Sequence, residues 1–218
     1  MKLRFLSLCG LIAPLLFVFT TILGGAISPG YSHITDTVSE LFSPGSPNRF
    51  LLTFLHTLFS ALLVLFGIGV LKFVHRYVKS KRIGIIGASA FIAMGVLNIM
   101  TATLFPQDAW GSPATLYGEM HMILSGVISI LSILYILLIG IWIHRAGISP
   151  FFRTYSITTI AAVVLTAGWF MKSYGSPIMG LSERVTILVG LQWTVALALL
   201  ILHQERESMY GNVHNVAS

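Results

Sequence analysis

Eight ionisable side chains, drawn from separate parts of the chain, have the chemistry to form a binding site. The two arginines among them could hold phosphate, because the planar guanidinium group suits phosphate oxygens. The carboxylates and imidazoles could shape a pocket around a polar ligand or relay protons. These candidates are Asp36, Glu40, Arg49, His56, Asp108, His121, Glu183 and Arg184. Their types predict a pocket for a polar head group, and no catalytic residue is assigned.

The histidines offer a second kind of chemistry. His33, His56 and His121, with Asp36 or Asp108, would supply enough ligands for a catalytic zinc site with one open position. No HxxxH or HExxH pair occurs, so these ligands would have to come from three separate segments. Histidines that bond a neighbouring helix are the simpler interpretation. We therefore expect no cofactor, with zinc as the alternative.

Six apolar stretches must position these residues. Of the 218 residues, 56% are hydrophobic and only 9% are charged, against about 25% charged in an ordinary soluble domain. Each stretch is long enough to cross about 30 Å of hydrocarbon as a helix. The stretches lie at residues 5–27, 50–74, 83–105, 119–143, 154–172 and 184–203. They predict an all-α, polytopic bundle of six transmembrane helices over residues 1–204, with a short, polar, disordered tail at 205–218.

The distribution of charge predicts the orientation of this bundle. Ten basic residues fall on one side of the predicted spans and three on the other, which places both termini and the ten in the cytoplasm. The net charge of +6 is thereby explained by topology, and we expect no nucleic-acid partner. Five of the seven acids lie on the opposite, extracytoplasmic side, a bias that insertion does not require. These acids are Asp36, Glu40, Asp108, Glu119 and Glu183.

Two segments on the extracytoplasmic side have a pattern of their own. In the loop after the first span, Ile34, Val38 and Leu41 recur at helical spacing. They predict a short amphipathic helix at the membrane interface, with a solvated connector as the alternative. In the second span, Arg49 and His56 share one helical face, with His56 about 10 Å deeper.

Among the polar residues of the later spans and their loops, His121 and Asp108 are the better candidates for chemistry, and the hydroxyl residues have simpler explanations. Asn98 lies below the loop at 105–108, and His121 opens the fourth span. The hydroxyl groups at Ser129 and Ser132 are typical of close helix packing in membranes. Ser182 is predicted to cap the last span.

Several motifs resemble one family of prokaryotic six-span membrane proteins, catalogued as domain of unknown function 998. The resemblance covers essentially the whole chain, and it implies a bacterial inner or plasma membrane. Family members often have a glycine where Phe42 stands, and cysteines around Asp108, both absent here. The motifs are residues 31–41 and 44–48, Phe-Pro-Gln-Asp at 105–108, Gly118 with His121, and Glu183-Arg184 with Trp193. A fainter similarity to the Frag1/DRAM/Sfk1 membrane proteins implies a lipid ligand.

Three functions follow as hypotheses. The first is binding or remodelling of a lipid head group, with Arg49 and Arg184 on the phosphate. The second is a small-solute or proton-coupled transporter in which His56, Asp108 and His121 relay protons, although no inverted repeat is visible. The third is a zinc-dependent intramembrane hydrolase. Membrane lipids are the expected partners, and whether the protein is an enzyme stays open.

Overall fold

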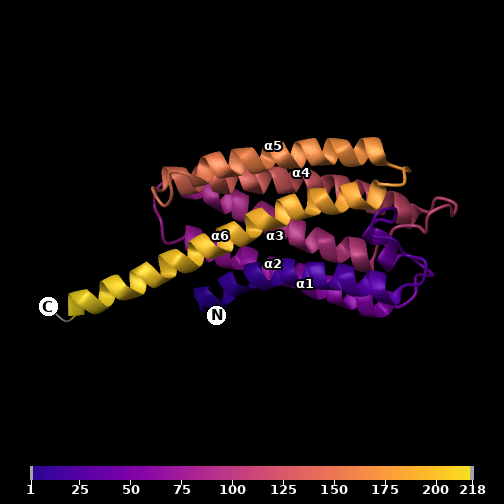
Figure 1. Ribbon diagram of the computed structural model, residues 1–218. Helices are drawn as coiled ribbons and strands as arrows, with labels where there is room; N and C mark the ends of the chain where they lie inside the picture. Colours follow the sequence, from indigo (N-terminus) through magenta and orange to yellow (C-terminus); the bar gives the residue numbers. More distant parts are fainter. Residues whose placement is uncertain (1, 217–218) are drawn as a thin grey trace.

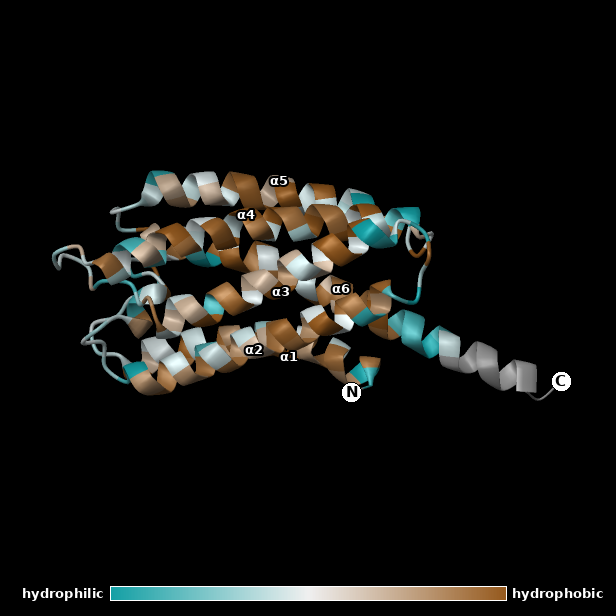
Figure 2. Ribbon diagram, turned by 180° about the vertical axis from the view of Figure 1, so that it is seen from behind, coloured by the Kyte–Doolittle hydropathy of each residue, from teal (hydrophilic) through white to brown (hydrophobic). Residues whose placement is uncertain are grey.

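Six helices dominate the computed structural model, which describes the backbone of residues 2–216 (Figure 1). All six are long and apolar enough to cross a membrane, and hydrophobic residues cover most of their length (Figure 2). The all-α prediction is confirmed, and the chain is a multi-pass membrane protein. The helices are α1 (Leu3–Ile27), α2 (Arg49–Val74), α3 (Lys81–Thr103), α4 (Leu116–Arg145), α5 (Phe152–Ser173) and α6 (Met179–Val216), with a 3-10 turn η1 (Ser39–Phe42) between α1 and α2.

The helices form a closed ring. Each one packs against the next in sequence, and α1 packs against α6. Because the first and last spans meet, the bundle has an interior that all six helices can face.

The two ends of the ring differ in their connections. The loops at 28–48, 104–115 and 174–178 lie at one end, which we call the η1 end (Figure 1). The described ends of the chain lie towards the opposite end, together with Lys81, Arg145 and Arg153, and we call this the basic end. The assignment of the basic end to the cytoplasm stays a prediction.

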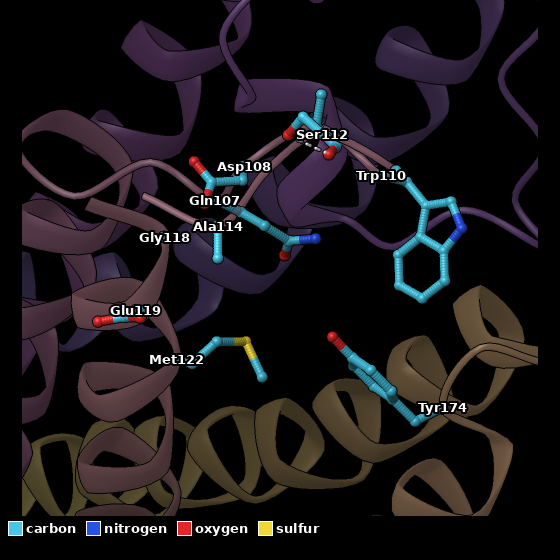
Figure 3. Close-up of a pocket in the computed structure, with 11 residues that line it drawn as sticks. Gln107, Asp108, Trp110, Ser112, Ala114, Gly118, Glu119, Met122 and Tyr174 are labelled. Carbon is cyan, nitrogen blue, oxygen red and sulfur yellow. Dashed lines mark hydrogen bonds between the residues drawn. The ribbon is translucent and has the colours of Figure 1, made fainter. Parts of the chain in front are cut away.

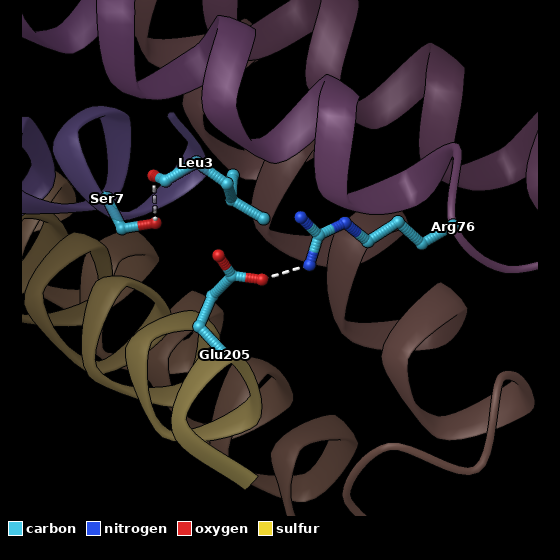
Figure 4. Close-up of polar contacts among 4 residues, drawn as sticks. All are labelled: Leu3, Ser7, Arg76 and Glu205. Carbon is cyan, nitrogen blue, oxygen red and sulfur yellow. Dashed lines mark hydrogen bonds and ion pairs between the residues drawn. The ribbon is translucent and has the colours of Figure 1, made fainter. Parts of the chain in front are cut away.

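The last helix is longer than its apolar stretch. The first five helices begin and end within one turn of the predicted ranges, but α6 begins at Met179 instead of residue 184. It continues to Val216, so the tail predicted to be disordered from residue 205 is helical there, while residues 217–218 lie outside the described residues. An ion pair between Glu205 and Arg76 ties the first turn of this tail to the α2–α3 loop (Figure 4).

Aromatic side chains fill the middle of the ring. The Tyr135 ring lies 4.6 Å from that of Phe91 and 5.5 Å from that of Trp193. Towards the basic end, Phe73 meets Trp142 edge-on at 5.8 Å. All five side chains are buried, and together they close the basic half of the interior.

Candidate functional site

The loop between α1 and α2 folds over the η1 end of the ring. Val38 and Leu41 are buried, in agreement with the apolar stripe predicted for this loop, but Ile34 is 54% exposed. The helical part is also shorter than predicted, because only η1 is helical and residues 33–36 form turns. The reason is that the backbone carbonyls of these turns bond to α6 instead of to each other.

Arg184 holds this loop through its backbone. Its Nη1 donates hydrogen bonds to the carbonyl oxygens of His33 at 2.9 Å and Asp36 at 2.7 Å. Its Nη2 donates to the hydroxyl of Tyr31, and the guanidinium group lies 5.5 Å from the centre of the Tyr31 ring. Burial raises the pKa of Tyr31, so this hydroxyl is neutral.

The first turn of α6 completes the attachment. The amide of Val38 donates to the carboxylate of Glu183 at 2.6 Å, and the amides of Gly180 and Leu181 donate to the carbonyls of Thr35 and Ile34. The loop thus satisfies amides that a helix N-terminus otherwise leaves free. We call these contacts and those of Arg184 the loop clamp.

Ser182 lies inside α6 rather than at its cap. Its hydroxyl donates to the carbonyl of Met179 at 2.8 Å. The prediction of a cap at Ser182 was wrong, because the loop extends the ordered helix by a turn.

The two acids of the loop stabilise its own turns. Asp36 accepts hydrogen bonds from the amide of Ser32 at 2.8 Å and the hydroxyl of Thr35 at 2.7 Å. Glu40 accepts from the amide and the hydroxyl of Thr37. Burial raises the pKa of Glu40, and the hydrogen bonds from Thr37 oppose that shift.

His121 joins two loops to α4. Its Nδ1 lies 2.9 Å from the carbonyl oxygen of Phe105, and its Nε2 lies 3.2 Å from the hydroxyl oxygen of Ser39 in η1. A carbonyl can only accept, so Nδ1 carries the proton, and in the neutral ring Nε2 accepts from Ser39. The contacts assign His121 a positioning role.

Asp108 organises the α3–α4 loop. Its carboxylate accepts from the amide of Thr115 at 2.8 Å and from the hydroxyl of the same residue at 2.7 Å. The hydrogen bond from the amide is the main reason that the pKa of Asp108 is lowered. A Cβ at Gly118 would lie 2.0 Å from Asp108 Oδ2, so only glycine allows this approach.

The three histidines do not form a ligand cluster. His33 is exposed and packs edge-on against Tyr31, with ring centres 5.5 Å apart, whereas His56 and His121 lie on α2 and α4. Within the described part of the chain, no group of three or more His, Cys, Asp or Glu residues is arranged to hold a metal ion.

A cavity of about 220 Å³ lies inside the η1 half of the ring. Residues of all six helices line it, and Val38 of the clamped loop also contributes to its wall. The lining is mainly aliphatic and aromatic. We call this space the central cavity.

Two polar groups of the central cavity are incompletely bonded. The His56 ring packs against Phe42 at 4.8 Å and Phe59 at 5.3 Å, and its nitrogens have no hydrogen-bond partner among the described residues. Asn98 donates to the carbonyl of Met94 at 3.2 Å, and its amide oxygen has no partner there either. Both residues are partly buried and border the cavity, so these polar atoms are free to bond to whatever occupies it.

Three residues that line the central cavity were not predicted to belong to a site. Ser129 and Ser132 were predicted to serve helix packing, yet both line the central cavity while donating to carbonyls of α4. Asn98 was noted only for its position below a loop. A polar residue deep in an apolar span was the available signal.

Two shallower pockets open at the η1 end. The first, of about 410 Å³, lies under the α3–α4 loop, and we call it the Tyr174 pocket. Figure 3 shows the side chains of Gln107, Trp110, Met122 and Tyr174 around its open space. The second, of about 470 Å³, lies beside the α1–α2 loop and shares Trp110 with the first. We call it the Tyr31 pocket.

The predicted site residues are divided among these spaces. Asp36 and Glu40 line the Tyr31 pocket, Asp108 lines the Tyr174 pocket, and His56 lines the central cavity. The remaining four line none of the three, and they are Arg49, His121, Glu183 and Arg184. The single convergent pocket of the prediction is therefore replaced by a clamped loop with a cavity below it and two pockets beside it.

Comparisons with known proteins place the chain in a family. Searches of curated proteins and of solved structures each gave no match. The family described as "Protein of unknown function (DUF998)" matches residues 11–200, a range that includes part or all of every helix. The chain belongs to this DUF998 family.

Proposed function

We propose that this membrane protein binds a lipid, with the apolar chain of the lipid in the central cavity and the polar end at the η1 end. The observation that carries the proposal is a cavity of about 220 Å³, lined by all six helices and largely apolar. A largely apolar pocket with a few convergent polar groups is the usual form of a small-molecule site.

His56 and Asn98 give the cavity its selectivity. An imidazole and an amide oxygen without partners are costly in a membrane interior unless something bonds to them. A ligand with a hydroxyl, ester or carbonyl group near the start of its chain would supply that bond.

The proposal changes the role predicted for the arginines. Arg184 donates to three backbone carbonyls and a hydroxyl, so its Nη1 is fully used while the loop clamp is formed, and the Nε that has no partner among the described residues is buried. Arg49 begins α2 and does not line the three spaces described above. A phosphate held by these two side chains is therefore disfavoured.

A binding role is preferred to transport because of what lies below the cavity. The buried rings of Phe91, Tyr135 and Trp193 contact one another across the ring of helices. A solute path to the basic end would have to separate these aromatic contacts, whereas a lipid site requires no such path.

Filling the cavity tests the proposal. Gly190 lines the central cavity, and a Cβ added there meets no atom within 4 Å. Gly190→Leu should therefore occupy the cavity without a clash. Gly168→Leu is the matched control, because Gly168 also has open space at its Cβ but does not line the cavity.

Native mass spectrometry of the purified full chain supplies the readout. We expect the wild type and Gly168→Leu to retain a co-purified lipid, and Gly190→Leu to lose at least about nine-tenths of it, as a loss of about 1.4 kcal/mol or more in binding implies. Equal retention by Gly190→Leu and Gly168→Leu, or no lipid on the wild type, would overturn the proposal.

A further inference from the structure

We propose that the Tyr174 pocket binds an ammonium group, so that the ligand of this protein is an amphiphile with a cationic head. This inference rests on the proposed function for the fate of the apolar chain, while the head-group site has its own evidence. That evidence is the pair of aromatic walls, the charge of the lining and the position of the pocket above the central cavity.

Two aromatic rings form part of the wall of the pocket. Trp110 comes from the α3–α4 loop and Tyr174 from the α5–α6 loop, and their ring centres lie 5.7 Å apart with planes inclined at 65°. Trp110 is 56% exposed and Tyr174 is 51% exposed, whereas Trp142 and Trp193 are fully buried. The two rings pack edge to face against each other, and exposed aromatic rings beside an open space are a common recognition element for quaternary ammonium groups.

The charge of the lining has the matching sign. Asp108 and Glu119 line the Tyr174 pocket, and the described lining contains no lysine or arginine. The hydrogen bond from the amide of Thr115 lowers the pKa of Asp108, so its carboxylate is ionised at neutral pH. In a chain with a net charge of +6, this region is locally acidic.

The neighbouring Tyr31 pocket adds to the same negative electrostatic potential. The Tyr31 pocket shares Trp110 and is lined by Asp36 and Glu40, again with no base among its described lining. Arg184 lies within the loop clamp, and Lys172 of α5, two residues before Tyr174 in the sequence, lines neither pocket. A phosphate or carboxylate would meet like charge in both pockets.

The Tyr174 pocket and the central cavity share no lining residue, but one face of α4 contributes to both. Met122 lines the pocket (Figure 3), and Ser129 lines the cavity. The seven residues between them are two helical turns, or about 10 Å. A head group beside Met122 would therefore lie about 10 Å from a lipid chain in the central cavity, a distance that a short linker can span.

Choline is a suitable probe because it carries the head-group charge without a lipid chain. We would titrate the full chain in maltoside micelles with choline, with its neutral isostere 3,3-dimethylbutan-1-ol, and with inorganic phosphate, using ligand-observed NMR. We expect choline to bind saturably and about tenfold more tightly than the isostere, and phosphate not to bind. Trp110→Leu should weaken choline binding about tenfold. Trp169→Leu on α5 is the matched control and should leave it unchanged.

The outcomes separate this inference from the proposed function. Equal binding of choline and the isostere, preferential binding of phosphate, no saturation by choline, or an unchanged affinity in Trp110→Leu would each overturn the cation site. Gly190→Leu should leave choline binding intact because Gly190 lines only the deeper cavity. If that variant keeps its lipid while choline still binds to the wild type, the cavity proposal fails and the cation site stands. If it loses its lipid while choline does not bind, the reverse holds.

Discussion

Two glycines packed in the basic half and two glycines in the η1 halves of α5 and α6 serve opposite purposes. A Cβ at Gly84 would lie 2.9 Å from the Trp142 ring, and one at Gly140 would lie 2.5 Å from the Ser156 hydroxyl. At Gly168 and Gly190, in the η1 halves of α5 and α6, an added Cβ meets nothing within 4 Å. Small residues bring helices together in the first case and leave space in the second. Close packing at the η1 end also uses glycine, as at Gly118 against Asp108, so the open space is confined to the surroundings of Gly168 and Gly190.

Two polar contacts between α5 and α6 contrast with the surroundings of His56. In the basic half of α5 and α6, the indole of Trp193 donates to Ser156 at 3.0 Å, and Gln192 donates to Thr159 at 3.2 Å. In the η1 half, the His56 ring has no such partner among the described residues. The base is not free of unpaired groups, since the buried indole nitrogen of Trp142 has no partner among the described residues. What sets His56 apart is that it borders an open cavity.

The largest expected effect comes from substituting a packed glycine. Gly140→Leu should lower the free energy of unfolding by about 3 kcal/mol, because its side chain collides with Ser156. Gly190→Leu should change the free energy by less than about 1 kcal/mol, since it gains helix propensity and meets open space. Unfolding in detergent with increasing denaturant measures both. Equal destabilisation would remove the contrast between the halves.

A smaller effect is expected from the loop clamp. Arg184→Met keeps an apolar stem but removes the hydrogen bonds to His33 and Asp36, at a cost of about 2 kcal/mol. Amide hydrogen exchange should accelerate in residues 31–41 and stay unchanged in α2 and α3. Arg153→Met, an exposed base at the other end, should change neither quantity. Unchanged exchange in the loop would show that Arg184 does not hold it.

The smallest effect is a local pH dependence at Asp108. Because the pKa of Asp108 is lowered, its ionised carboxylate stabilises the fold at every pH above the ordinary pKa of 3.8. This contribution is lost as the pH falls through the lowered pKa. Glu40 has the opposite sign, because its pKa is raised from 4.5 and its contribution is lost as the pH rises. The NMR shift of the Thr115 amide isolates Asp108 and should titrate below 3.8.

Two variants test the assignment of that titration. Asp108→Asn should abolish it. Glu119→Gln should leave it in place, because the Glu119 carboxylate accepts no hydrogen bond from Thr115 and only the backbone amide of Glu119 bonds to that residue. A midpoint at or above the ordinary value in the wild type would mean that the hydrogen bonds from Thr115 do not favour the ionised form.

The sequence predicted the spans well because the thickness of the hydrocarbon layer dictates their length. It also identified Val38 and Leu41 as the buried side of a loop. It could not show that Glu183 and Arg184 face backbone amides and carbonyls, since such partners leave no trace in side-chain chemistry. The central cavity was equally hidden, because it depends on how residues as distant as Phe17 and Gly190 are spaced after folding.

Closure of the ring has a consequence for biogenesis. The loop that follows the first span is fastened by Glu183 and Arg184 at the start of the last span. A chain that has inserted only the first five helices therefore lacks the loop clamp, and the wall of its central cavity is incomplete. Because residues of all six helices line the central cavity, that cavity is complete only after the final helix has docked against the first.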